Sequence, residues 1–130
     1  MRSGGETYRK QKHNESQLQM LLARWLRQKK IFYTASLLGV NLGARVGAIR
    51  KAMGVNPGDH DIIILMPSRQ FHGMTLELKV KGGNDEDENQ IRFQIRATEL
   101  GYYSVIMPAT MDFQEAYDWA VREIEAYLQI

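Results

Sequence analysis

The sequence predicts a mixed α/β fold in which a sheet of roughly four strands is flanked by helices. Short apolar runs alternate along the chain with segments whose apolar residues recur at helical spacing. The length of 130 residues favours a single domain, and a hydrophobic fraction of 44% is sufficient for a buried core. Together these observations favour one globular domain over a fibrous or disordered chain.

The first half of the chain is predicted to contain a long helix, a strand and a short helix. Residues 1–12 are polar and basic, and we expect them to form a flexible arm before a domain that spans 13–130. Asn14 and Gln17 have the spacing of a capping box, and apolar residues follow at helical spacing, so a helix is predicted from Asn14 to about Lys30. A short strand over 31–35 and a short helix over 44–53 follow.

The second half of the chain is predicted to contain a hairpin, a helix, a strand and a last helix. The apolar run after Asp61 predicts a buried strand, and the segment that ends at Val80 predicts a second strand antiparallel to it. Gly101 is a natural end for the helix that follows, and Asp112 is a natural start for the last one. The predicted order is helix, strand, helix, strand, strand, helix, strand, helix, with the last five elements over 61–66, 71–80, 88–100, 102–107 and from 112 onward.

Composition excludes several classes of protein. The chain has no cysteine, which excludes disulfides, zinc–thiolate sites and thiol catalysis. No apolar run approaches the ~20 residues of a membrane helix, and the polar N-terminus lacks the apolar segment of a signal peptide. We therefore expect a cytoplasmic protein, of a bacterium or of a phage-infected cell, with no membrane partner.

Basic residues are concentrated near the N-terminus. The net charge is only +2, but four basic residues lie on the first predicted helix after the basic arm: Arg24, Arg27, Lys29 and Lys30. Such a stripe suits a polyanion such as a nucleic acid, because phosphate contacts release counterions. A solvated helix face is the commoner explanation of the same pattern.

Three charged residues of the predicted hairpin form a candidate catalytic centre. Glu77 and Lys79 lie two residues apart in a strand, so their side chains point to the same face. Asp61 opens the preceding strand, and the short hairpin would bring its carboxylate to the same sheet end as Glu77. Two converging carboxylates repel each other unless a cation lies between them, and Mg²⁺ prefers oxygen ligands of this kind. Alternatively, Glu77 and Lys79 form a simple ion pair, and Asp61 is only a turn or strand-edge residue. Asp59, two residues earlier, is a competing candidate for the metal ligand.

Glu15 and Gln90 are two further candidates. Glu15 shares the angular stripe of Leu18 and Leu22 on the first predicted helix, so its side chain should lean toward the core side. Gln90 stands at the start of the helix after the hairpin, where an amide can contact a water, a carboxylate or a phosphate. Alternatively, Glu15 is simply an acidic residue in the first turn, where the helix dipole favours it, and Gln90 is an exposed residue at the start of a helix.

The order and spacing of these candidate residues along the chain resemble those of the virus-type replication-repair nuclease (VRR-NUC) domain of the PD-(D/E)XK nuclease superfamily. The resemblance covers roughly residues 14–107 and includes Gly54-Val55-Asn56-Pro57-Gly58, Asp61, Glu77-Leu78-Lys79, Gln90 and Leu100-Gly101. The family usually has proline before the strand-opening aspartate, where this chain has His60. We expect this change to be tolerated, and His60 is a candidate for contact with a phosphate or a metal-bound water.

The resemblance implies a restriction-endonuclease-like fold and hydrolysis of DNA phosphodiester bonds that depends on Mg²⁺ or Mn²⁺. The implied metal ligands are Glu15, Asp61, Glu77 and the backbone carbonyl of Leu78. Lys79 would orient the attacking water, and Gln90 would position that water or hold a neighbouring carboxylate. The resemblance also implies branched DNA, such as Holliday junctions, as the substrate and a homodimer as the active form.

Five basic residues outside this set are candidates for phosphate contacts, although each is individually a common surface charge: Arg45, Arg50, Lys51, Arg92 and Arg96. Trp119 lies off the apolar stripe of the last predicted helix and is a candidate for a dimer interface. Three other functions stay open. The first is a non-catalytic DNA-binding module with the same fold, and the second is a nuclease that acts on flaps or linear duplex. The third is a structural protein, which predicts no metal binding.

Overall fold

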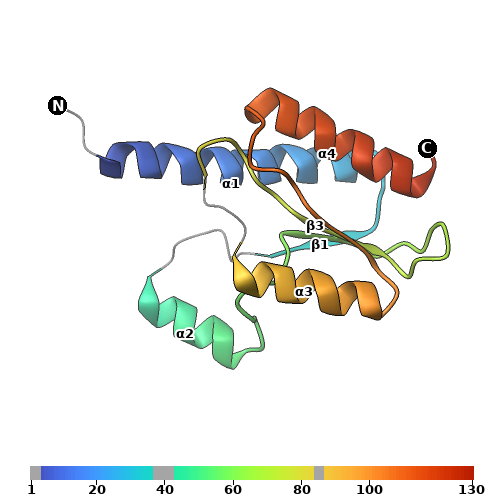
Figure 1. Ribbon diagram of the computed structural model, residues 1–130, viewed down its shortest axis with the longest axis horizontal. Coiled ribbons are helices and arrows are strands. Elements are labelled where there is room, and N and C mark those ends of the chain that lie inside the picture. Colours follow the sequence, from blue (N-terminus) through green and yellow to red (C-terminus); the bar gives the residue numbers. More distant parts are fainter. Residues whose placement is uncertain (1–3, 37–42, 84–86) are drawn as a thin grey trace.

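The computed structural model describes residues 4–36, 43–83 and 87–130. Within these ranges, four helices and four strands follow one another in the predicted order (Figure 1). They are α1 (Gly4–Gln28), β1 (Tyr33–Ala35), α2 (Ala44–Ala52), β2 (Ile62–Ile64), β3 (Met74–Glu77), α3 (Glu88–Glu99), β4 (Tyr103–Ile106) and α4 (Phe113–Leu128). The predicted order of elements is confirmed, and most of their ends lie within a few residues of the predicted positions.

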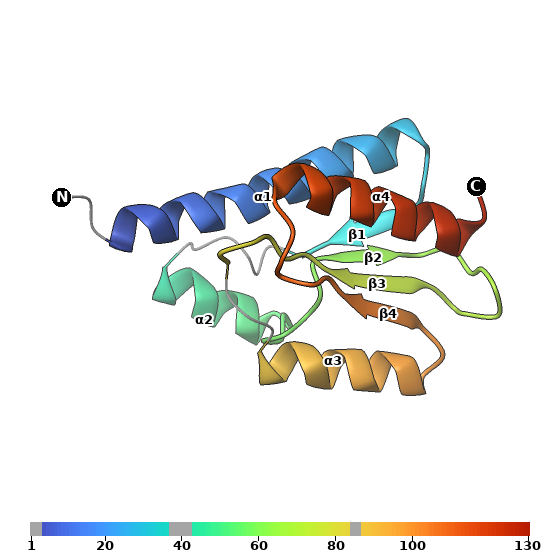
Figure 2. The ribbon, with the colours of Figure 1, turned by 45° about the horizontal axis from the view of Figure 1, so that its top comes forward.

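The described strands form one mixed sheet in the order β1-β2-β3-β4. The β1–β2 and β2–β3 pairs are antiparallel, as predicted for the hairpin, and the β3–β4 pair is parallel. Figure 2 shows α1 and α4 on one face of this sheet and α3 on the other, with α2 beside α3. The pairing of Ile62 with Leu76 sets the register of the hairpin, and it places Asp61 opposite Glu77 at one end of the sheet.

The main apolar core lies between the sheet and the layer formed by α1 and α4. Leu18, Leu22 and Leu26 of α1 are fully buried there, as their helical spacing predicts. They belong to one cluster with apolar residues of the sheet and the buried stripe of α4, which consists of Ala116, Ala120, Ile124 and Tyr127. Side chains alternate along β3, so Leu76 joins this core while Glu77 faces α3. The polar site under α3 is therefore supported from behind by a close-packed apolar layer.

Helix α1 begins earlier than predicted. The helix begins at Gly4, so the predicted start at Asn14 is wrong, and residues 4–12 of the predicted arm are helical. Extending an existing helix adds one hydrogen bond for each residue fixed, whereas only the first turn is costly, so polar residues can continue a helix that packing has already nucleated. Figure 1 shows this first part of α1 extending beyond the sheet. Residues 1–3 of the predicted arm lie outside the described residues.

The ends of α3 and α4 follow from their capping residues. Asp87 Oδ1 accepts a hydrogen bond of 2.8 Å from the Gln90 backbone, and Asp112 Oδ1 accepts one of 2.9 Å from the Glu115 backbone. Gly101 follows α3 with a φ of 95°, which a glycine adopts without strain. Trp119 of α4, predicted as an interface candidate, is half-buried and packs against the core. In the described ranges, no helix is long and apolar enough to cross a membrane.

Candidate active site

Asp61 and Glu77 meet where β2 begins and β3 ends. Both carboxylates are buried, with exposed fractions of 8% and 6%. Asp61 Oδ2 accepts a hydrogen bond of 2.7 Å from the backbone N–H of Leu78, which fixes the aspartate against the end of β3. The hairpin register therefore brings the two acids together, as the sequence predicts.

The electrostatics of this pair require a neutralising charge or a proton. Burial and, after it, repulsion from Asp61 raise the pKa of Glu77 to about 9 against the opposing effect of Lys79. Burial also raises the pKa of Asp61, while the hydrogen bond from Leu78 favours the ionised form. Because the two carboxylates interact so strongly, they hold both charges only when a cation joins them.

Of the two carboxylate oxygens of Glu77, one accepts a hydrogen bond and the other does not. Its Oε2 accepts a hydrogen bond of 2.9 Å from Gln90 Nε2. Its Oε1 is buried and has no hydrogen-bond partner among the described residues. A buried carboxylate oxygen without a partner is costly, and it is the kind of atom that a metal ion or a bound proton satisfies.

Lys79 lies in the same buried environment. Only 3% of its surface is exposed, and its positive charge lowers the pKa of both Asp61 and Glu77. A buried ammonium beside two carboxylates offsets only one of their charges. With both carboxylates ionised the centre carries a net negative charge, which a proton on Glu77 or a divalent cation neutralises.

Gln90 joins the start of α3 to the carboxylate pair. Its side-chain oxygen accepts from the Asp87 backbone at 3.2 Å, and its backbone N–H donates to the Asp87 side chain, which completes a capping box. The amide nitrogen of the same side chain donates to Glu77. Of the two roles predicted for Gln90, the described contacts are those of a residue that holds a neighbouring carboxylate.

His60 is a structural residue and not a surface contact. The predicted contact with a phosphate or a metal-bound water is wrong, because only 1% of the His60 surface is exposed and both ring nitrogens are engaged. Nε2 lies 3.1 Å from the Gln90 carbonyl oxygen and Nδ1 lies 3.1 Å from Thr75 Oγ1. The ring also packs on Phe93, with centroids 4.4 Å apart. His60 therefore fastens α3 to the sheet beside the carboxylate pair.

The protonation state of His60 follows from this environment. Burial lowers its pKa from 6.5 to about 4, so the ring is neutral near neutral pH. A carbonyl can only accept, so Nε2 carries the proton and Nδ1 accepts from the Thr75 hydroxyl. Ser104 Oγ, 2.5 Å from Thr75 Oγ1, then donates to Thr75. The hydrogen bonds of this series therefore all run in one direction, from the Ser104 hydroxyl to the Gln90 carbonyl in the first turn of α3.

The glycine-rich segment before Asp61 packs against the start of α3. Gly58 has a φ of 90°, and a Cβ at this position would collide with the backbone of Asn89. Only glycine permits both this backbone conformation and this approach. The Pro57-Gly58 turn thus helps to set the position of Gln90 relative to β2.

Glu15 approaches the centre from α1, on the other side of the sheet end. It lines a cavity together with Asp61 and Leu78, and a Cβ at Gly83 would collide with its carboxylate. Its charge contributes to raising the pKa of Glu77. Among the described residues, however, no three His, Cys, Asp or Glu side chains are grouped closely enough to hold a metal ion. The close pair is Asp61 and Glu77, and Glu15 stands farther away.

The donor set fits a hard divalent cation. The two carboxylates offer oxygen atoms, and Mg²⁺ binds through one or two carboxylates while it keeps several waters. The Leu78 carbonyl stays a predicted ligand. The orphaned Glu77 oxygen gives such an ion a ligand atom that no described protein group uses. Glu15 lines the same cavity as Asp61 but does not join the close pair.

The five predicted phosphate contacts lie on α2 and α3, away from α1. Arg45, Arg50 and Lys51 belong to α2. On α3, Arg92 pairs with Glu88 at 2.5 Å and Arg96 pairs with Glu99 at 3.5 Å, and all four side chains are exposed. Exposed ion pairs of this kind are weak, so they leave both arginines available to a phosphate. Their role in DNA binding stays a prediction.

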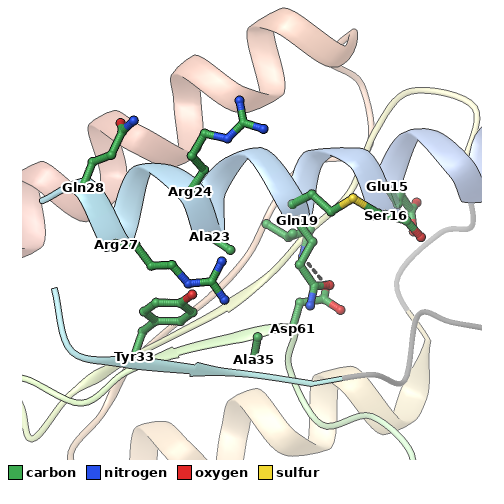
Figure 3. A pocket seen from close by; sticks show the side chains of 12 residues that line it. Glu15, Ser16, Gln19, Ala23, Arg24, Arg27, Gln28, Tyr33, Ala35 and Asp61 are labelled. Atoms are coloured by element: carbon green, nitrogen blue, oxygen red, sulfur yellow. Dashed lines mark hydrogen bonds between the residues drawn. The ribbon is translucent and has the colours of Figure 1, made fainter. Parts of the chain in front are cut away.

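Sequence reasoning missed the cavity between α1 and β1. It has a volume of about 790 Å³ and runs from Glu15 and Asp61 to Arg27 and Tyr33 (Figure 3). The basic residues on the first predicted helix did indicate one wall of this cavity, because Arg24 and Arg27 line it. Tyr33 gave no such signal, because its place beside Arg27 depends on how the chain turns between α1 and β1.

A solved structure described as a "VRR_NUC domain protein" has the same fold. The two chains superpose with a TM-score of 0.69 over 89% of this chain and 88% of the other, at 21% sequence identity. No family model and no curated protein matches the sequence. At this identity the likeness establishes the fold, and it confirms the predicted restriction-endonuclease-like class and the resemblance to VRR-NUC at that level.

Proposed function

We propose that this protein is a metal-dependent DNA endonuclease of the VRR-NUC type, which hydrolyses phosphodiester bonds. The observation that carries the proposal is the buried pair of Asp61 and Glu77, with its orphaned oxygen and with Lys79 beside it. A plain ion pair between Glu77 and Lys79 would leave Asp61 without a counter-charge. The fold shared with a VRR_NUC domain protein supports the same assignment.

The metal would be Mg²⁺ or Mn²⁺, held by Asp61, Glu77 and the Leu78 carbonyl, with Glu15 reaching it through water. When bound, such an ion polarises the scissile phosphate and makes a bound water more acidic. The chain itself contributes rigidity: the Leu78 N–H holds Asp61, and Gln90 holds Glu77. Fixed carboxylates keep the site ready without reorganisation during the reaction.

Lys79 acts on the reacting groups directly. Its ammonium orients the attacking water and stabilises the negative charge that develops on the phosphate. Because Lys79 is almost fully buried, this interaction takes place in a medium of low polarity, where it is stronger than in water.

The preferred substrate in this proposal is branched DNA, such as a Holliday junction, and the active form is a homodimer in the cytoplasm. A chain of 130 residues offers one such active site, and symmetric incision of two strands needs two. A two-fold dimer supplies them with a single kind of interface.

The test compares a labelled four-way junction, a flap and a linear duplex, each with Mg²⁺, Mn²⁺ or EDTA. Lys79→Ala is the variant, and Lys81→Ala is its matched control, because Lys81 is an exposed lysine two residues away. Metal-dependent cleavage that is lost in Lys79→Ala and kept in Lys81→Ala supports the nuclease. Binding without cleavage under every metal condition would instead identify a non-catalytic DNA-binding module, and cleavage of only the flap or the duplex would replace the junction as substrate.

A further inference from the structure

The cavity between α1 and β1 continues from the carboxylate pair along one face of α1. Glu15, Gln19, Ala23 and Arg27 line it and are spaced four residues apart, so they form one row along the helix. The row from Glu15 to Arg27 is about 18 Å long at 1.5 Å per residue. The other wall includes Tyr33 and Ala35 of β1, the edge strand of the sheet.

The cavity has opposite charges at its two ends. Both acidic residues that line it, Glu15 and Asp61, lie at the catalytic end. Arg24 and Arg27 line the other part, and no ion pair within the described ranges engages either of them. A polyanion with one phosphate at the catalytic centre would therefore meet positive charge farther along α1.

Arg27 and Tyr33 form a platform at the basic end. Figure 3 shows the Arg27 side chain extending from α1 toward the Tyr33 ring, and the guanidinium carbon lies 6.0 Å from the ring centroid. A planar base between the two groups needs about 7 Å, which is twice the rise per base of a DNA strand. Arg27 is exposed, so a shift of roughly 1 Å would admit a base against the tyrosine.

The size of the cavity indicates which form of DNA it suits. A volume of about 790 Å³ is that of a small-ligand site, which is enough for a short stretch of nucleotides and too little for a duplex. Inside a duplex the faces of each base are covered by its neighbours, and a scissile phosphate within the duplex lies between such bases. Beside a cut within the strand, an unpaired base can expose a face to Tyr33 and a stacked, paired base cannot.

We propose that this cavity binds an unpaired stretch of the substrate strand next to the scissile phosphate, with a base on Tyr33 and a phosphate on Arg27. This inference rests on the proposed nuclease function and adds a substrate requirement to it. The enzyme would favour DNA whose strand is single-stranded beside the cut, such as a flap or a junction opened at its branch point, over DNA that is paired throughout.

The test measures binding in EDTA, where no cleavage occurs, by fluorescence anisotropy. The two probes are a hairpin duplex with a short single-stranded tail and the same duplex with a blunt end. Tyr33→Leu should weaken binding of the tailed probe by roughly 5- to 100-fold and leave the blunt probe within about 2-fold. Tyr33→Phe keeps the ring and should bind the tailed probe as the wild type does.

Arg27→Gln provides a second, independent readout. It should reduce the slope of log K against log salt for the tailed probe by about 0.7, the value for one phosphate contact to a single strand. Arg122→Gln removes an exposed arginine of α4 and should leave this slope unchanged. A 2-aminopurine in the tail should be quenched by the wild type and by Tyr33→Phe, and not by Tyr33→Leu.

The outcomes separate this inference from the proposed function. If folded Tyr33→Leu binds the tailed probe like the wild type, or loses affinity for both probes equally, the strand site is wrong even when metal-dependent cleavage persists. If the wild type cleaves no DNA with any metal but Tyr33→Leu loses the tailed probe selectively, the strand site stands and the nuclease assignment fails.

Discussion

Gln90 and Glu77 are joined by a hydrogen bond of 2.9 Å from the amide nitrogen to Oε2, and the same glutamine closes the capping box of α3. One side chain thus fixes both the start of a helix and the orientation of a buried carboxylate. The cap provides the structural reason for glutamine at this position, and the contact with Glu77 provides the functional one. Substitution can separate the two roles.

Gln90→Glu should lower the cleavage rate by roughly 10- to 100-fold, the usual effect of removing a partner that orients a metal ligand. Glutamate serves at this position of a capping box as well as glutamine does, so α3 keeps its start. It cannot donate to Glu77, and it adds a third negative charge nearby. The measurement is the single-turnover cleavage rate, with circular dichroism to verify helix content.

Asp87→Ala is the control for Gln90→Glu. It removes the N-cap and should cost about 1 kcal/mol of stability while it leaves the contact between Gln90 and Glu77 in place. Cleavage should therefore stay close to that of the wild type. An equal loss of activity in both variants would mean that the cap matters and the carboxylate contact does not.

The metal-free protein should become less stable as the pH rises from 7 to about 9. The native state holds a proton on Glu77, whose pKa is raised to about 9, while the unfolded chain releases it near 4.5. Because the native state then binds more protons, its free energy of unfolding falls with pH across this window. Urea melts in EDTA measure this slope, and the pH range lies above the window in which His60 titrates.

Glu77→Gln should flatten that slope. It removes the titrating carboxyl at nearly constant volume and should make the metal-free protein more stable at pH 8 by about 1–4 kcal/mol, because the native state no longer has to hold a proton that the unfolded chain has released. Glu99→Gln, an exposed glutamate of α3, should leave the slope as it is in the wild type. An unchanged slope in Glu77→Gln would show that another group titrates.

Binding of Mg²⁺ should release about one proton at neutral pH. The ion replaces the proton that the carboxylate pair shares, since Glu77 with a pKa of about 9 is still protonated there. Calorimetry in two buffers of different ionisation enthalpy counts the protons released. Asp61→Asn should abolish binding, and Asp118→Asn on α4 should not. Binding without proton release would contradict a metal at the carboxylate pair.

Much of the site could be predicted from the sequence because it depends on local geometry. Alternation in a strand places Glu77 and Lys79 on one face, and a short hairpin brings Asp61 to the same sheet end. Capping chemistry placed the starts of α3 and α4 within one residue. These features depend only on the periodicity of side chains in helices and strands and on turn and capping residues, all of which can be recognised in one amino-acid sequence.

The remaining features depend on partners far away in the sequence. His60 stands in a polar turn, and its burial depends on Phe93 and on the Gln90 carbonyl, which lie about thirty residues further along the chain. The start of α1 was misplaced for a related reason, since the capping box at Asn14 is a local signal that an adjoining helical segment overrides. Local patterns rank candidate boundaries, and the tertiary structure selects among them.

His60→Ala should cost about 2–4 kcal/mol of stability, because it removes a packed ring and leaves Thr75 and the Gln90 carbonyl without partners. His60→Gln can still donate toward the Gln90 carbonyl, so it should lose less. In Glu77→Gln, which removes the opposing proton uptake on Glu77, stability should also fall as the pH drops from 6.5 toward 4, since the unfolded chain takes up the proton that buried His60 resists.

The control for His60 is His72→Ala, which removes an exposed histidine and should change stability by about 0.5 kcal/mol or less. Chemical denaturation at pH 7 and at pH 5 in the Glu77→Gln background separates the two effects, because the acid-induced loss should disappear when His60→Gln is added and persist when His72→Ala is added. Since His60 holds the first turn of α3, His60→Ala should also slow cleavage more than it weakens DNA binding. If His60→Ala is as stable and as active as the wild type, the bond between His60 and α3 does not position Gln90, and the carboxylate pair must be held by the hairpin alone.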